Sequence, residues 1–189
     1  NWFERMKSGI LTRIKREIPE GIWSKCKLCG ETTYQHALDR NCWVCPHCGN
    51  HFPIGHEKYI RLLADAGSFA ETEARLATAD PLRFRDHRRY SERIREARRA
   101  AGMNEALCTG VCTIGGHPVA LGVMDTRYIL GSMGGATGEK GCRLIGRARA
   151  DGRALVLVCQ SGGARMQEGT LSLMQMAKIS AHLRRFADA

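Results

Sequence analysis

ALVLVCQSGGARMQEG, residues 154–169, combines an apolar run, a glycine pair and the start of a predicted helix. Its first five residues are almost wholly apolar, which is typical of a strand buried on both faces of a sheet. Gly162 and Gly163 follow, and the chain then continues as a sequence that predicts a long helix. A strand that delivers glycines to the start of a helix leaves backbone N–H groups free to face a ligand oxygen. A plain strand-to-helix turn is the alternative, and these residues alone do not decide between the two.

The segments before this stretch extend the same pattern. ALCTGVCTIGG (106–116) and HPVALGVMD (117–125) are β-rich runs joined by a glycine pair, which predicts a hairpin. GSMGGATGEKGCRLIGRARADG (131–152) reads as a glycine-rich loop that runs into a helix. The order strand, strand, loop, helix, strand, loop, helix predicts an α/β fold.

Two further helices are expected nearer the N-terminus. Residues 56–66 place apolar side chains at helical spacing and close on Gly67, a typical helix stop. After a weakly alternating segment that we interpret as an irregular strand and linker, residues 85–102 carry Tyr90 and Ile94 on one stripe, with arginines over the rest. That arrangement predicts an amphipathic helix.

Residues 26–50, CKLCGETTYQHALDRNCWVCPHCGN, hold five of the nine cysteines. Two C-x2-C pairs are separated by fifteen residues, a spacing typical of a structural zinc site. Such a small module cannot bury a core large enough to fold alone, so metal binding supplies its folding energy. Four thiolates close a tetrahedral site, which argues against zinc hydrolysis. Cys42 is interpreted as a partly buried free thiol. The predicted zinc ligands are Cys26, Cys29, Cys45 and Cys48.

Neither glycine loop matches a nucleotide-binding motif. In YILGSMGGATGEK (128–140) the P-loop pattern fails because Lys140 precedes Gly141 rather than Ser or Thr. Ser161 lacks the GxSxG setting of a hydrolase nucleophile, and a turn-capping serine is commoner. The sequence offers no persuasive acid–base pair, an absence that chemistry run by backbone amides and a reactive cofactor would explain.

Composition and charge set the broad class. The chain is 43% hydrophobic and 25% charged, and it has no apolar run near the ~18 residues of a membrane span. The N-terminus has no secretion signal, so we expect a cytosolic protein with reduced thiols. The formal net charge is +10, and residues 83–99 carry eight arginines against three acidic residues, +5 in all. This balance indicates anionic partners, either nucleic acid or phosphate-rich small molecules.

At this point the residues resemble a known family, the β subunits of the multi-subunit acetyl-CoA carboxylase carboxyltransferase of bacteria and plastids. The resemblance covers essentially the whole chain. It is carried by NWFER (1–5), PEGIWSKC (19–26), FRDHRRY (84–90), GSMGGATGEK (131–140) and SGGARMQEGTLSLMQMAK (161–178).

The resemblance implies a crotonase-like (ClpP-like) spiral of ββα units, incomplete here, behind an N-terminal four-cysteine zinc ribbon. Four parts are then expected: an arm over 1–24, the ribbon over 25–52, a helical linker region over 53–104 and the first part of the carboxyltransferase domain over 105–189. The compartment implied is the bacterial cytosol or the plastid stroma.

The resemblance also implies partners and a reaction. A carboxyltransferase α subunit would complete an α2β2 assembly, and a biotin carboxyl carrier protein, charged by biotin carboxylase, would deliver carboxybiotin. The carboxyl group would pass to acetyl-CoA to give malonyl-CoA for fatty-acid synthesis. The backbone amides of Gly162 and Gly163 would be catalytic, holding the enolate oxygen. Arg165 would cap the loop or meet a CoA phosphate, or else lie on the helix surface. The residues expected at acyl-CoA are Gly131, Ser132, Met133, Gly134, Ala164 and Arg165.

Two departures from the family pattern stand out. Leu130 replaces a Gly or Met, and residues 135–137 read Gly-Ala-Thr where the family commonly has Ser-Val-Val. The sequence also stops inside the helix after SGGAR, whereas family members continue with further ββα units and a second glycine pair in a GGV segment. We therefore expect a C-terminally truncated chain that does not catalyse the reaction alone.

A second function from another class stays open at this stage. A zinc-ribbon nucleic-acid binder would use the ribbon, the basic residues Lys25, Lys27 and Arg40 around it, and the arginine helix. A solvated helix face is the plainer interpretation of those arginines. A ClpP-like serine hydrolase shares the fold but lacks a marked triad.

Overall fold

The computed structural model describes residues 22–188, and the chain divides into two compact units that meet between Pro53 and Ile54. The predicted N-terminal arm over 1–24 lies almost wholly outside the described residues.

The first unit is a small ribbon. β1 (Trp23–Lys25) pairs antiparallel with β2 (Thr32–Tyr34), and α2 (Gln35–Arg40) follows directly. Leu38 of α2 is fully buried, while much of the rest of the ribbon is exposed. A core this small contributes little hydrophobic free energy, as expected of a module that a metal ion stabilises.

The second unit contains a four-stranded sheet in the order β3-β4-β5-β6. β4 (Leu107–Ile114) and β5 (His117–Met124) form the predicted hairpin, β3 (Ala70–Thr72) adds antiparallel to β4, and β6 (Ala154–Val158) adds parallel to β5. Two glycines with positive φ, Gly115 and Gly116, make the hairpin turn, and both N–H groups donate to the Asp65 carboxylate at 2.9 Å. The turn is therefore pinned to the chain that precedes β3.

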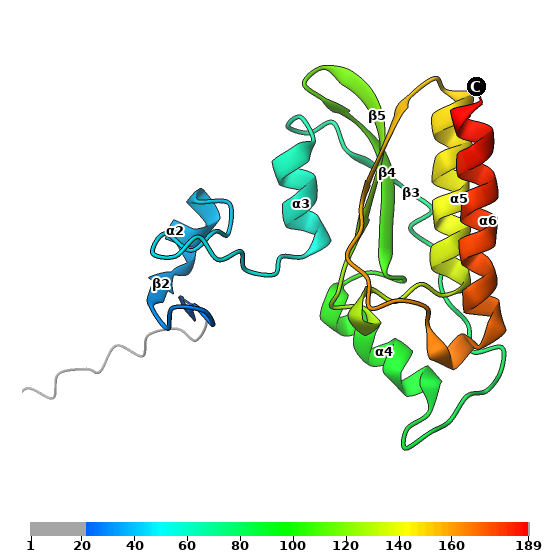
Figure 1. Ribbon diagram of the computed structural model, residues 1–189, viewed down its shortest axis with the longest axis horizontal. Coiled ribbons are helices and arrows are strands. Elements are labelled where there is room, and N and C mark those ends of the chain that lie inside the picture. Colours follow the sequence, from blue (N-terminus) through cyan, green and yellow to red (C-terminus); the bar gives the residue numbers. More distant parts are fainter. Residues whose placement is uncertain (1–21, 189) are drawn as a thin grey trace, which may run out of the picture. The chain divides into compact units, whose positions relative to one another are not determined.

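Helices cover both faces of this sheet (Figure 1). α3 (His56–Leu63) packs on one face, against alternate residues of β5 that include Val119 and Leu121. α5 (Gly135–Ala150) and α6 (Thr170–Ala187) lie side by side on the other face, where Ala120 of β5 contacts α5. The period-two alternation of β5 thus separates two cores. Among the described residues, none of the helices combines the length and apolar character of a membrane span.

α4 (Tyr90–Ala101) confirms the predicted amphipathic helix. It buries Tyr90, Ile94 and two alanines along one stripe and ends at Gly102, whose φ is 68°. Segment 53–104, for which the sequence predicted a helical linker region, supplies α3, β3 and α4 to the second unit.

Two local expectations are wrong. The side chains of β6 were expected to be buried on both faces, but they are exposed or only half-buried, because within the described residues β6 pairs with β5 alone and forms an edge. The last helix was expected to begin right after Gly163. It begins at Thr170 instead, behind a loop and the 3-10 turn η2 (Met166–Glu168), since positive φ values at Gly163 and Gly169 interrupt helical geometry.

Candidate functional site

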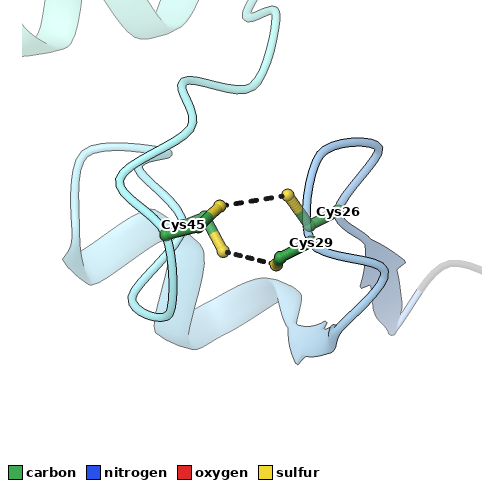
Figure 2. Close-up of side chains that lie close together, drawn as sticks. Cys26, Cys29 and Cys45 are labelled. Atoms are coloured by element: carbon green, nitrogen blue, oxygen red, sulfur yellow. Dashed lines mark hydrogen bonds between the residues drawn. The ribbon is translucent and has the colours of Figure 1, made fainter.

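Four cysteines of the first unit turn their sulfur atoms toward one another, as Figure 2 shows for three of them. The Sγ atoms of Cys26 and Cys48 are 3.7 Å apart, and those of Cys29 and Cys45 are 3.8 Å apart. Ligands about 2.3 Å from a tetrahedral zinc ion lie about 3.8 Å from one another, so this thiol set fits zinc. The fold therefore brings together the four cysteines that the spacing singled out.

Cys42 does not join this cluster. Its side chain is exposed rather than partly buried as expected, because it stands in the turn after α2 with a φ of 50°. Of the four cysteines in the second unit, Cys108, Cys112 and Cys142 are buried and Cys159 is exposed. Burial raises the pKa of the Cys108 thiol to about 12, which makes this thiol unreactive at neutral pH.

The two glycine loops of the second unit lie side by side, joined by a short parallel ladder. The N–H of Gly162 donates to the carbonyl of Leu130 at 2.9 Å, and the N–H of Met133 donates to the carbonyl of Gly163 at 2.8 Å. The N–H of Arg165 then donates back to the carbonyl of Met133 at 2.9 Å. This ladder brings together all the acyl-CoA and catalytic residues that the sequence predicted, over 131–134 and 162–165.

Glycine is required on the 131–134 side of this ladder. A Cβ at Gly131 would lie 2.1 Å from the carbonyl oxygen of Gln160, and the φ of this residue is 68°. A Cβ at Gly134 would lie 2.5 Å from a carboxylate oxygen of Glu168. The loops approach each other closely because these positions have no side chain.

The backbone amides of the 162–165 segment differ in availability. Gly162 donates within the ladder, whereas the N–H of Gly163 donates to the exposed hydroxyl of Ser161 at 3.0 Å. The N–H of Ala164 has no acceptor among the described residues. Gly163 and Ala164 are thus consecutive residues whose N–H groups take no part in the ladder between the two loops.

The Arg165 side chain is fully buried, which excludes the interpretation as a helix-surface residue. Its guanidinium forms a bidentate ion pair with the Glu105 carboxylate, with N–O distances of 2.5 and 3.1 Å. It also donates to the hydroxyl of Ser132 at 3.1 Å and to the carbonyl of Ser132 at 2.5 Å. It also lies 5.3 Å from the centre of the Tyr128 ring. Arg165 therefore binds the 131–134 loop from inside the protein, and its buried guanidinium is not exposed to meet a CoA phosphate, the other role that the sequence suggested.

Glu168 is the second buried charge at this site. One carboxylate oxygen accepts from the hydroxyls of Thr78 at 2.7 Å and Tyr90 at 2.6 Å and lies 3.3 Å from the Arg165 guanidinium, while the other accepts from the N–H of Gly135 at 2.5 Å. Burial acts to raise the pKa of Glu168, but the hydrogen bonds from Gly135, Tyr90 and Thr78 outweigh it, and the net shift is downward. An ionised Glu168 also suits the N-terminus of α5, where Gly135 is the first residue.

Sequence reasoning missed this network. Glu168 stands within residues 154–169 and Glu105 precedes the hairpin, but no periodicity or motif marks either as buried. Thr78 and Tyr90 come from segments about 80–90 positions away from Glu168 in the chain. Only the tertiary fold brings these partners together.

A further polar cluster lies at the start of α3. His56, Glu57 and Asp125 hold donor atoms close enough together to share a metal ion. The guanidinium of Arg127 lies among them, 2.6 Å from both carboxylates, and supplies the positive charge that a metal would bring. Asp125 also accepts the N–H of His56 at 2.9 Å and so caps the helix.

Comparison with known proteins identifies two matching domain families. The family described as "Carboxyl transferase domain" matches residues 56–187, and the family described as "Acetyl-CoA carboxylase zinc finger domain" matches residues 23–48. The zinc-ribbon nucleic-acid alternative is not favoured by these matches.

Similar curated proteins indicate the same family. The chain is 46% identical over 192 residues to the acetyl-coenzyme A carboxylase carboxyl transferase subunit beta of Prochlorococcus marinus (strain MIT 9303), covering 100% of this chain and 66% of that relative. It is 47% identical over 185 residues to the subunit of that name from Gloeobacter violaceus, covering 96% of this chain and 61% of the relative. The chain thus spans just under two thirds of the length of these relatives.

Solved structures share the fold. A transcarboxylase 12S structure with methylmalonyl-coenzyme A and methylmalonic acid bound superposes with a TM-score of 0.58 and 25% identity, over 69% of this chain and 23% of the other. The Pseudomonas malonate decarboxylase MdcD-MdcE heterodimer superposes with a TM-score of 0.51 and 22% identity, over 70% of this chain and 47% of the other. Together with the matched ribbon, these neighbours confirm the predicted crotonase-like α/β fold behind a zinc ribbon.

Proposed function

This chain belongs to the carboxyl transferase family, and on that premise we propose that it is the larger part of the β subunit of an acetyl-CoA carboxylase carboxyl transferase. The observation that carries the proposal is the ladder between the two glycine loops, which gathers the residues expected at acyl-CoA inside the segment that the family matches. The complete subunit would transfer a carboxyl group from carboxybiotin to acetyl-CoA and so form malonyl-CoA.

The partners follow from the reaction. Biotin would arrive on a biotin carboxyl carrier protein, charged by biotin carboxylase, and a carboxyltransferase α subunit would complete the site in an α2β2 assembly. We place this assembly in the bacterial cytosol or the plastid stroma. Secondary binding of RNA or DNA by the basic surface is not needed for this function.

The chain's own residues would bind and polarise the thioester. The consecutive amides of Gly163 and Ala164 would donate to its oxygen as negative charge develops there, with the Ser161 hydroxyl turned aside. Gly162 would act through its ladder bond to Leu130, which fixes the backbone that presents those amides. Residues 131–134 would line the acyl-CoA site next to these amides. The buried Arg165 would hold residues 131–134 in place through its hydrogen bonds to Ser132.

The ribbon would contribute structure rather than chemistry. We propose one zinc ion held by Cys26, Cys29, Cys45 and Cys48, whose thiolates leave no ligand position for a substrate. The zinc ion would supply the folding free energy that the small ribbon core lacks.

The proposal is tested with the full-length subunit assembled with its α subunit. Malonyl-CoA formation is measured from acetyl-CoA and carboxybiotin for the wild type and for Gly163→Val. The φ of Gly163 is 101°, so a valine forces the backbone to shift and displaces the donor amides. We expect a rate loss of about a hundredfold or more, the scale seen when an oxyanion donor is removed.

Gly152→Val is the matched control. Gly152 also has a positive φ, 60°, and open space around it, but it lies in the turn between α5 and β6, outside the glycine loops. This variant should lose a similar amount of stability and keep its rate within about threefold of the wild type. If the two variants lost the same fraction of the malonyl-CoA formation rate, or if neither lost any, the assignment of the site would be contradicted.

A further inference from the structure

A hollow of about 400 Å³ lies between the C-terminal halves of α5 and α6. Small residues make it: a Cβ at Gly146 would meet no atom within 4 Å, and Ala150 follows one turn later. Its full lining is Ile145, Gly146, Arg149, Ala150, His182 and Arg185. At about 1.5 Å of rise per residue, Gly146 lies about 16 Å along α5 from Gly135, so the hollow is separate from the glycine loops.

The ionisable groups that line this hollow are all basic. They are Arg149 from α5 and His182 and Arg185 from α6, with no acidic residue among them. None of their side chains makes a hydrogen bond or an ion pair with another residue in the range 22–188. Basic groups that converge without a counter-charge repel one another, and a bound anion would remove that repulsion.

Neighbouring arginines on the same two helices behave differently. Arg147 pairs with Asp151 at 3.4 Å, and Arg184 pairs with Asp188 at 3.0 Å. The helix dipole favours a basic residue at any last-turn position, so it explains all four arginines equally. It does not explain why the unpaired two, together with His182, come from two helices to face one hollow.

We propose that this hollow binds the phosphate group of a small molecule, either a phosphate ester or a pyrophosphate. A guanidinium presents parallel N–H donors that match the spacing of phosphate oxygens, and two guanidiniums flanking one hollow hold such a group from both sides. A volume of about 400 Å³ falls within the usual range for small-molecule sites and leaves room for an organic portion. The site goes beyond the proposed carboxyl transfer and does not depend on it.

Binding is tested on the full-length subunit by titration calorimetry at fixed salt, with inorganic pyrophosphate and ribose 5-phosphate as probes. We expect saturable binding of at least one probe, and tighter binding of ribose 5-phosphate would show that the organic portion contributes. Arg149→Gln combined with Arg185→Gln should weaken binding about tenfold or more, because both guanidinium groups are lost. Gly146→Met should weaken it similarly by filling the hollow while leaving the charge unchanged.

The matched control is Arg147→Gln combined with Arg184→Gln, which removes the same charge from the same helices outside the hollow. Its affinity should stay within about twofold of the wild type, a change of about 0.4 kcal/mol. No saturable binding of either probe to the wild type would overturn the proposal. Equal loss in the control pair would also overturn it, since binding would then reflect net charge alone.

Discussion

At the scale of single residues, the buried pair Arg165 and Glu168 decides how the glycine loops are held. Each is fully or almost fully buried, and each joins segments that are distant in the chain. A buried charge is tolerated only when it is paired and hydrogen-bonded, and here both conditions are met. The buried hydrogen bonds of Arg165 and Glu168 therefore help to hold the two loops in position, in addition to the short backbone ladder between the loops.

Glu168→Gln is predicted to destabilise the chain by about 3 kcal/mol, because the amide reduces the charge that balances Arg165 and cannot accept on both of its terminal atoms. The measurement is the free energy of unfolding of the second unit from urea titration. The control is Glu139→Gln, which breaks partly exposed ion pairs of Glu139 with Arg143 and Lys178 and should cost less than about 1 kcal/mol. If both variants cost the same, the network does not act as described.

The pH dependence of stability follows from the same carboxylate. The folded protein lowers the pKa of Glu168, so its contribution is complete above the ordinary glutamate pKa of about 4.5 and is lost as the pH falls through the folded-state pKa. Asp125 behaves likewise: burial acts to raise its pKa, but bonds from His56 and Arg127 lower it overall. We predict stability that is nearly flat from pH 7 to 5 and falls below pH 4.5, with a shallower fall in Glu168→Gln. If stability fell just as steeply below pH 4.5 in Glu168→Gln as in the wild type, this fall could not be assigned to Glu168.

At the scale of elements, α5 carries glycines with opposite roles. A Cβ at Gly138 would lie 2.3 Å from the side-chain oxygen and 2.6 Å from the Cβ of Gln175 on α6, whereas Gly146 has open space. Gly138 is thus needed for the close packing of α6, whereas Gly146 has room for a larger side chain and lowers the helix propensity of α5.

Substitution by alanine should therefore have opposite effects on stability at these two positions. Gly146→Ala is predicted to stabilise the protein by about 0.8 kcal/mol through helix propensity. Gly138→Ala is predicted to destabilise it by about 1–2 kcal/mol because α6 must move. Thermal unfolding midpoints of the two variants give the comparison, and a shift in the same direction for both would refute the packing argument.

The elements themselves were largely predictable from the sequence. The hairpin over 106–125 and the apolar stripe of α4 follow from local periodicity and turn residues, which act within a few positions of the chain. The late start of α6 depends on left-handed glycines at 163 and 169, which a helical apolar pattern does not reveal. The ladder between residues 130–133 and 162–165 depends on tertiary contact, so the sequence could predict its residues through family resemblance but not their geometry.

At the scale of the whole molecule, two units with different sources of stability share one chain. The second unit buries two apolar cores around its sheet, whereas the ribbon has a very small core and four cysteines close enough together to share a metal ion. The four sulfur atoms fit zinc, and four thiolates leave the ion no catalytic position. We therefore expect the ribbon to contribute structure and not a catalytic metal.

Removing zinc is predicted to unfold the ribbon alone. A chelator, or Cys45→Ser, should abolish amide hydrogen-exchange protection over residues 23–52 and leave the protection of β4, β5 and α5 unchanged. Cys42→Ser should retain one zinc ion per chain, because this thiol lies outside the cluster. Loss of zinc in Cys42→Ser, or collapse of the second unit without metal, would count against this division.

We propose that the two glycine loops together form the acyl-CoA site. The most direct test is amide hydrogen exchange of the full-length subunit with and without saturating acetyl-CoA. We expect added protection at residues 131–134 and 162–165, Gly163 and Ala164 above all, with no change in the ribbon. Protection confined to the ribbon or to α4, with both glycine loops unchanged, would contradict it.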